Sequence, residues 1–379
     1  MPLYYTEDQA MLAESVTGFM ADEGGIKKQL RHWRDTHCKD GFGHALWKQF
    51  AEMGLTGMLA AEADGGLAMG HVEAGIVLAE IGRNLTPSPF LTTSVMGVTA
   101  LKEASDELRG RWLPGIIAGE TVLAMAIDEG AKHKPEKIAC RAERAGNGFR
   151  LTGAKDFVIH GTSADAIIVA ARTSGSDSDA DGVTLFAVPK DAAGIGHNAV
   201  RLVDSSIASH VRFDGVELDG SSVIGEVDGG RTLLNKVLSA GRIGAAAEQT
   251  GVGGGAFAMT TTYLKTRKQF GKLIGEFQAL QHRAAHLYSE LEIAEAVVIK
   301  AQQLLDGGSE RAELMVSVAK AKAARACNLA VREGVQMHGG VGMTDEYDIG
   351  LYMKRERALT EFMGDANYHA ERVAQLSGY

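Results

Sequence analysis

The stretch YLKTRKQFG, residues 263–271, places three cations, a tyrosine, a glutamine and a phenylalanine before a glycine. Tyr263 and Arg267 are four residues apart, so on a helix they share one face, and Gly271 can end that helix. An arginine fork matches a pair of phosphate oxygens, and the following EFQ (276–278) offers amide contacts to a nucleotide. The alternative is a solvated basic helix end. The stretch predicts one of these two roles for the end of a helix.

A second glycine-rich stretch is VQMHGGVGMTDEY, residues 335–347. Gln336 is followed by Gly339, Gly340 and Gly342, and these glycines end a helical run and expose backbone N–H groups. Such a cluster of N–H groups can form a nest for a diphosphate or for adenine. A plain helix stop is the alternative.

A third run, GVGGGA at residues 251–256, has the form GxGxxA of a dinucleotide fingerprint. That fingerprint works only where a strand runs into a helix, because the pyrophosphate must approach the helix N-terminus. The twenty residues before this run, RTLLNKVLSAGRIGAAAEQT, have a helical pattern instead. We therefore expect small residues that allow close helix packing or line a ligand cavity.

The hydrophobic pattern changes twice along the chain. Residues 1–120 read as helices, residues 121–230 as short strands rich in Val, Ile and Phe, and residues 231–379 as long helices again. The fold class is therefore α+β, with a helical domain, a small β domain and a C-terminal helical domain like a four-helix bundle. SGSDSDADG (174–182) is predicted to be a solvated hairpin loop without function. One apolar helix stripe is formed by Phe277, Leu280, Ala284, Leu287, Leu291, Ala294 and Val298.

The overall composition excludes several classes of function. The chain has 379 residues, a net charge of -9 and a pI near 5.8, so nucleic acid is not expected as a partner. It has no apolar run long enough to span a membrane. Its three cysteines do not form a disulfide framework, and its N-terminus lacks the features of a signal or transit peptide, so we expect a cytoplasmic protein. His282 and His286 are four residues apart but have no third ligand nearby, so no metal site is predicted.

Together these motifs resemble the acyl-CoA dehydrogenase family, over nearly the whole chain. The resemblance is carried by the two motifs at residues 263–278 and 336–342 and by LTGAKDFVIHGTSADAIIVAAR (151–172) in the β domain. It implies the same order of α, β and α domains. It also implies an FAD cofactor that lies between two subunits, with an acyl-CoA as substrate and an electron-transfer flavoprotein as electron acceptor.

The resemblance also implies which residues contact FAD. Those on the diphosphate and adenine side are Arg267, Gln269, Phe270, Phe277 and Gln278, together with Gln336, Gly339 and Gly340, which reach the nucleotide bound mainly by the neighbouring subunit. In the β domain, Phe157 falls where the family usually has a tryptophan on the flavin ring, and Ile127 lies in MAIDEG (125–130), which departs from the family's Thr-Glu-Pro-Gly loop. Ile159 replaces a hydroxyl residue that usually bonds flavin N5, and isoleucine has no such group.

The usual catalytic base is absent from this sequence. The family's glutamate falls at Gly364, counted from Arg355, and an alternative family position falls at Gly241. Arg242 matches an arginine near the thioester end of the family's pocket. Carboxylates that can replace the missing base are Glu248 and Asp365. Glu248 lies on a buried helix face two turns from Gly241, so lining the acyl cavity is its alternative role, and for Asp365 the alternative is a helix N-cap. Glu361 is a weaker candidate and is expected to be exposed.

The resemblance therefore predicts α,β-desaturation of an acyl-CoA, with hydride transfer to flavin N5, in fatty acid or steroid side-chain catabolism. The assembly is expected to be a homotetramer or a heterotetramer. Three alternatives remain. The chain can be a base-lacking, non-catalytic flavin subunit whose paralogous partner carries the base, a flavin-binding scaffold, or the same fold catalysing an elimination that needs no α-proton base.

Overall fold

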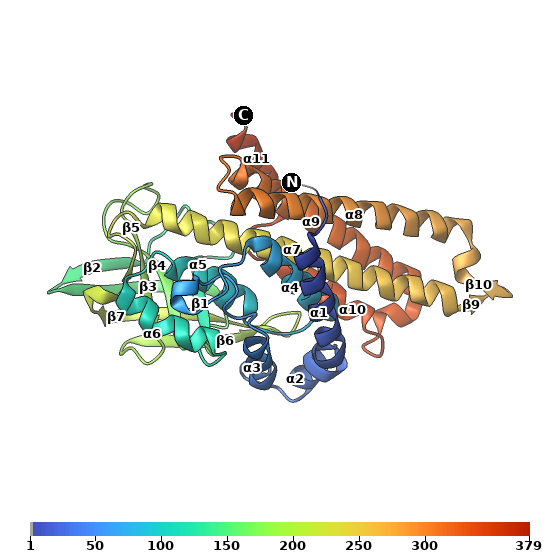
Figure 1. The fold of residues 1–379 in the computed structure, drawn as a ribbon, viewed down its shortest axis with the longest axis horizontal. Coiled ribbons are helices and arrows are strands. Elements are labelled where there is room, and N and C mark those ends of the chain that lie inside the picture. The colour runs from blue at the N-terminus through green and yellow to red at the C-terminus, as the bar shows by residue number, and fades with distance from the viewer. Residues whose placement is uncertain (1–2) are drawn as a thin grey trace. The chain divides into compact units, whose positions relative to one another are not determined.

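The computed structural model describes residues 3–379, in which the predicted order of helices, strands and helices is confirmed (Figure 1). By its internal contacts the chain divides into two compact units. The helical unit comprises Met1–His32, His71–Pro87 and Arg242–Tyr379, and the sheet unit comprises Trp33–Gly70 and Ser88–Gly241. Within residues 3–379, no helix has both the length and the hydropathy that crossing a bilayer requires.

The helical unit is built on long helices. Its elements are α1 Glu7–Phe19, η1 Met20–Gly24, η2 Lys27–Arg31, α4 His71–Asn84, the part of α7 (Gly230–Thr266) from Arg242 onward, β9 Lys268–Gln269, β10 Lys272–Leu273, η6 Ile274–Glu276, α8 Gln278–Asp306, α9 Ala312–His338, η7 Gly339–Met343, α10 Ile349–Glu361 and α11 Ala366–Leu376. Thr6 caps α1 through a reciprocal pair of hydrogen bonds with Gln9. Figure 1 shows α8 and α9 side by side and the β9–β10 hairpin where α7 turns into α8.

The apolar stripe predicted for α8 is the core between α8 and α9. Leu287, Leu291 and Ala294 are buried in one cluster with Ala326 and Ala330 of α9. Residues at steps of three and four point to the same side of a helix, so this stripe fixes which face of α8 meets α9.

The glycine run at residues 251–256 lies inside α7, where α4 passes at very short distance. A Cβ atom on Gly251 would be 1.8 Å from the Ala79 carbonyl oxygen, and one on Gly255 would be 2.6 Å from the Arg83 carbonyl oxygen. From the other side, a Cβ atom on Gly82 of α4 would be 2.1 Å from the Glu248 carbonyl oxygen. Close helix packing is therefore the role of this run, and a dinucleotide fingerprint is excluded because no strand precedes it.

The sheet unit combines short helices with one mixed sheet. Its helices are α3 His44–Glu52, η3 Glu62–Asp64, η4 Leu91–Gly97, α5 Val98–Leu101, α6 Asp106–Ile117 and η5 Gly220–Ser222, and α2 His32–Asp35 begins at its edge. The strands are β1 Leu123–Ala126, β2 Arg141–Ala145, β3 Gly148–Ile159, β4 Ala166–Arg172, β5 Val183–Pro189, β6 Ile195–Arg201, β7 Ile207–Leu218 and β8 Val223–Ile224. They pair in the order β6-β7-β3-β2-β4-β5-β8, and β1 pairs with β4 in parallel.

The loop at residues 174–182 connects β4 to β5, which pair as antiparallel neighbours, so the predicted hairpin is confirmed. Arg172, which is only 1% exposed, lies under this loop. Its guanidinium donates hydrogen bonds to the carbonyl oxygens of Asp177, Asp179 and Asp181. The side chains of the loop are thus solvated, while its backbone carbonyl oxygens accept hydrogen bonds from the buried Arg172 guanidinium.

Candidate functional site

The β9–β10 hairpin displays the motif that follows α7. Gln269 pairs with Lys272 in an antiparallel register, which leaves Phe270 and Gly271 as a two-residue turn. Both turn residues have positive φ, 53° and 78°, as a type I′ turn requires. A left-handed conformation is uncommon for a residue with a large side chain. The turn holds the Phe270 ring 91% exposed, beside the exposed Arg267 and Gln269.

An aromatic stack brings the second motif to this hairpin. The Tyr263 ring of α7 stacks on the His338 ring at the end of α9, with 4.4 Å between centroids, and Tyr347 packs against both rings. The His338 Nδ1 atom is 2.7 Å from the Gly334 carbonyl oxygen, and burial lowers the pKa of His338. The stack therefore fixes the end of α9 to the end of α7. The sequence showed each motif but not the ring pair that joins them.

The remaining predicted residues of this unit follow the hairpin or the end of α9. Gln278 begins α8 and is exposed, whereas the half-buried Phe277 lies below the Lys272 ammonium, 4.3 Å from its ring centroid. Gly339 and Gly340 are exposed, and a Cβ atom on either would meet nothing within 4 Å. Gly339 has a φ of 64°, a left-handed conformation that favours glycine. The backbone conformation, and not the space around it, therefore explains the glycine at this position.

Gln336 opens onto a groove of about 700 Å³ along α9. Three arginines, Arg283, Arg325 and Arg332, also line the groove, and Asn367 of α11 closes one side. Three glutamates line the groove as well: Glu333 pairs with Arg283 at 3.3 Å, Glu290 pairs with Lys322 at 2.6 Å, and Glu356 accepts a hydrogen bond from Asn328. The groove therefore presents arginines, glutamates and amides side by side, and Gln336 is the predicted cofactor contact that lines it.

This donor set fits the adenine and diphosphate end of FAD. A diphosphate needs cationic or N–H donors, and adenine needs an aromatic face or amide groups. The exposed guanidinium of Arg267, the exposed ring of Phe270 and the amides of Gln269, Gln278 and Gln336 supply both kinds of contact. The fold of this chain leaves these side chains accessible to a ligand.

In the sheet unit, the predicted flavin-ring contacts lie at the ends of two strands. Ile127 follows β1 and is buried, and its carbonyl oxygen accepts a hydrogen bond of 3.0 Å from the Lys155 ammonium. Lys155 is fully buried and also pairs with Glu129 at 2.7 Å, so a buried ion pair holds the MAIDEG loop. Phe157 sits at a bulge of β3 with a φ of 53°, which turns its ring outward so that it is 48% exposed.

Other side chains lie close to both positions that are predicted for the usual base, Gly364 and Gly241. A Cβ atom on Gly364 would be 2.4 Å from Cδ1 of Tyr368, and the φ of Gly364 is 101°, which L-residues rarely adopt. In the sheet unit, a Cβ atom on Gly241 would be 2.9 Å from both Sδ and Cε of Met96. Gly364 is therefore required by its backbone conformation and by the Tyr368 ring, whereas at Gly241 the obstacle is the flexible end of the Met96 side chain, which can move.

The two candidate carboxylates both have strong partners. Glu248 is 2% exposed and accepts a hydrogen bond of 2.8 Å from Nε of Arg355, along with a second N–H of the same guanidinium. Asp365 is the N-cap of α11, where its Oδ1 accepts the N–H groups of Asn367 and Tyr368. The alternative predicted for Asp365, a helix cap, is confirmed. Glu361 is exposed and pairs with Arg357, as expected for a surface residue.

The sequence predicted a role for Arg242 but did not identify the residues that contact it. Its side chain is 1% exposed, and a terminal N–H donates a hydrogen bond of 2.9 Å to the Tyr368 hydroxyl. Tyr368 was not among the predicted residues. A tyrosine four residues after Gly364, on the first turn of α11, was the available signal for it.

Lys320 of α9 is a second residue that the sequence did not single out. It is fully buried, and its ammonium donates to the carbonyl oxygens of Leu359 at 3.0 Å and Gly364 at 3.2 Å. It therefore ties the loop that carries Gly364 to α9. Burial lowers the pKa of Lys320 to about 7, and the nearby acidic groups oppose this shift; they are Glu356, Cys327, Asp365 and Glu361.

This lowered pKa predicts a pH dependence of stability. Between pH about 7 and about 10.5 the unfolded chain binds a proton at Lys320 that the folded chain does not, so stability should rise with pH by at most about 1.4 kcal/mol per unit. Lys320→Met should have a shallower slope in urea unfolding measured across this window. Lys322→Met, which removes a half-buried lysine paired with Glu290, should keep the wild-type slope. Equal slopes in all three proteins would contradict the assignment.

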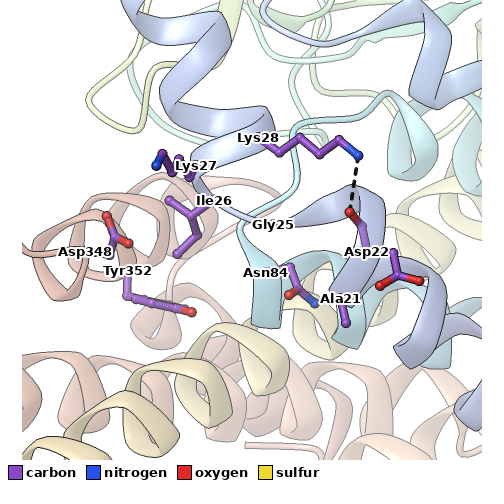
Figure 2. Close-up of a pocket in the computed structure, with 9 residues that line it drawn as sticks. All are labelled: Ala21, Asp22, Gly25, Ile26, Lys27, Lys28, Asn84, Asp348 and Tyr352. Carbon is purple, nitrogen blue, oxygen red and sulfur yellow. Dashed lines mark hydrogen bonds between the residues drawn. The ribbon is translucent and has the colours of Figure 1, made fainter.

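A pocket of about 340 Å³ elsewhere in the helical unit shares none of the predicted residues (Figure 2). In Figure 2 the Lys28 side chain reaches the Asp22 carbonyl oxygen, and it also pairs with Glu23 at 2.6 Å. Asp348 pairs with Arg31, and the Tyr352 hydroxyl donates to the Arg83 carbonyl oxygen. These polar side chains thus serve the packing of η1, η2 and α10.

Comparison with known proteins accounts for this arrangement. Sequence models of three acyl-CoA dehydrogenase domains match the chain in order: the N-terminal domain at residues 6–120, the middle domain at 125–216 and the C-terminal domain at 228–377. The acyl-CoA dehydrogenase FadE12 of Mycobacterium tuberculosis is 30% identical over 358 residues, which cover 93% of this chain and 91% of that protein.

Two similar solved structures are assemblies of two differently named chains. A variant of the Tcur3481-Tcur3483 steroid ACAD is 27% identical with a TM-score of 0.88, and the alignment covers 98% of each chain. The ChsE4-ChsE5 complex from Mycobacterium tuberculosis is 25% identical with a TM-score of 0.89, and the alignment covers all of both chains. With three domain matches over most of its length, the chain belongs to the acyl-CoA dehydrogenase family of oxidoreductases, whose members bind FAD.

Proposed function

We propose that this chain catalyses α,β-desaturation of an acyl-CoA thioester. The observation that carries the proposal is the intact cofactor motif, in which Arg267, Gln269 and Phe270 are exposed on a constrained hairpin next to the end of α9. A large side chain held in a left-handed conformation and exposed is the kind of strained residue that gathers at ligand sites. Arg242, the residue matched to the thioester end of the family's pocket, is also retained and buried.

The residues of each unit have separate tasks in this proposal. In the helical unit, the β9–β10 hairpin, Phe277, Gln278, Gln336, Gly339 and Gly340 would hold the diphosphate and adenine of FAD. In the sheet unit, Phe157 would pack on the flavin ring, and Ile127 would line it from the loop fixed by Lys155. When bound, FAD supplies the acceptor for the hydride that leaves the β-carbon.

The α-proton must also be removed, and here the chain departs from its family. Glu248 and Asp365 are the candidates from the sequence, but each would have to give up strong contacts to act as a base. Glu248 would leave the Arg355 guanidinium without its counter-charge, and Asp365 would uncap α11. These contacts favour structural roles for both carboxylates.

The second candidate function is a base-lacking subunit of a heteromeric acyl-CoA dehydrogenase. It is favoured by the conformation and packing that require glycine at position 364, by the glycine at position 241, and by the likeness to the two assemblies of differently named chains. In that case a paralogous partner would supply the base. In either case we propose an electron-transfer flavoprotein as the electron acceptor.

One experiment separates the two candidates. The chain is purified alone, its flavin is counted per chain from the visible spectrum, and acyl-CoAs with straight-chain, aryl and steroid side-chain acyl groups are added without oxygen. We expect stoichiometric FAD that bleaches with at least one acyl-CoA. Bound flavin that never bleaches, but does so once a paralogous chain is added, would establish the heteromeric function instead. Arg267→Ala is the control for the cofactor motif and should lower the flavin content without unfolding the chain.

A further inference from the structure

The Tyr368 ring lies against Gly364, the position that the resemblance assigns to the family's catalytic glutamate. Its Cδ1 and Cε1 atoms lie 2.4 and 3.0 Å from the point where a Cβ atom on Gly364 would be. The ring therefore starts where the missing side chain would start.

The Tyr368 hydroxyl accepts a hydrogen bond from a buried cation. Arg242 donates an N–H to it at 2.9 Å, and the centre of the guanidinium lies 5.5 Å from the ring centroid. Arg242 is 1% exposed, so water screens this interaction little. A buried cation that donates to a phenol oxygen stabilises the phenolate that remains when the proton leaves.

Two further contacts fix the position of Tyr368. Its backbone N–H donates to Oδ1 of Asp365 at 2.7 Å, in the first turn of α11. Lys320 holds the Gly364 carbonyl oxygen, and the Tyr368 ring packs on that same glycine. A proton-transfer group needs such preorganisation, because a small displacement from its partner costs much of the rate.

We propose that Tyr368, assisted by Arg242, transfers the α-proton of the acyl thioester in place of the missing carboxylate. This inference rests on the proposed function. The C–H bond at the α-carbon breaks, the proton passes to the phenolate oxygen of Tyr368, and the electron pair stays on the thioester as an enolate. In the reverse direction the phenol returns the proton to the α-carbon, so the step requires no further reactant.

Deuterium exchange at the α-carbon tests this step directly. The flavin-bound protein is incubated in D₂O without oxygen with the same acyl-CoA panel, and deuterium at the α-carbon is measured by mass spectrometry. Tyr368→Phe keeps the ring that packs on Gly364 but removes the hydroxyl. We expect exchange to fall by about a hundredfold, in the range for loss of a general acid or base, with unchanged flavin content. The melting temperature should fall by only a few degrees, because the Arg242 guanidinium loses one hydrogen-bond partner. Tyr352→Phe, which removes a hydroxyl bound to the Arg83 carbonyl oxygen, is the matched control and should exchange like the wild type.

The outcomes distinguish this inference from the proposed function. Equal exchange in wild type and Tyr368→Phe overturns the role of Tyr368. If the wild type exchanges α-protons but its flavin never bleaches, desaturation is overturned and the role of Tyr368 stands. If the wild type neither exchanges α-protons nor bleaches its flavin, both proposals are overturned. If Tyr368→Phe fails to fold, Tyr368→3,5-difluorotyrosine replaces it, because a more acidic phenol of nearly the same shape should change the exchange rate at neutral pH. An unchanged rate would overturn the inference.

Discussion

Glu248→Ala is expected to lower the free energy of unfolding by about 3 kcal/mol, since it removes one partner of a largely buried ion pair. The Glu248 side chain is 3% exposed, and the Arg355 side chain is 27% exposed. After the substitution the guanidinium would keep its charge in a place where water reaches it poorly. The loss is therefore the cost of leaving Arg355 uncompensated, together with the cavity left by the removed side chain.

The measurement is the shift of the urea midpoint of each variant. Arg357→Ala serves as the control, since it breaks an ion pair with Glu361 on the surface of α10 in which both side chains are more than half exposed. Its effect should stay below about 0.5 kcal/mol. Arg355→Met added to Glu248→Ala should recover part of the loss, because it removes the isolated charge.

The same variant decides between two roles for Glu248. A structural role predicts that Glu248→Ala is less stable but reduces its flavin with acyl-CoA at nearly the wild-type rate. Lost reduction with unchanged stability would identify Glu248 as the base and would count against Tyr368. The structural role predicts lost stability with retained flavin reduction, and the catalytic role predicts the reverse. The free energy of unfolding and the rate of flavin reduction must therefore be measured on one preparation.

Local patterns were enough to predict most of the fold. The steps of three and four in α8 and the Val- and Ile-rich strands carry their own periodicity, so the order of helices and strands followed from the sequence. The contacts around Gly364 could not be predicted from such local patterns. Tyr368 and Arg242 are 126 positions apart, and their contact depends on how α7 and α11 pack. No periodicity encodes such a contact.

Lys320 and Glu248 show what a sequence can and cannot reveal about buried charges. Each lies on a helix face of small and apolar residues, so its burial was detectable, and for Glu248 it was predicted. The partner could not be inferred, because Arg355 is one of several cations on a helix far along the chain. A buried charge seen in a sequence thus indicates that a partner exists without identifying it.

Gly251→Ala is expected to destabilise the helical unit by about 3 kcal/mol, although alanine is the better helix former. The reason is the contact with α4, where the added Cβ atom would lie 1.8 Å from the Ala79 carbonyl oxygen and 2.8 Å from the Ala79 Cα atom. Backbone atoms cannot turn away as a flexible side chain can, so α4 and α7 would have to separate along their whole contact.

Gly18→Ala on α1 is the matched control, because a Cβ atom there would meet nothing within 4 Å. That variant should gain up to about 1 kcal/mol from helix propensity alone. Opposite shifts of the two melting temperatures would establish that the glycine run serves helix packing, and equal shifts would refute it.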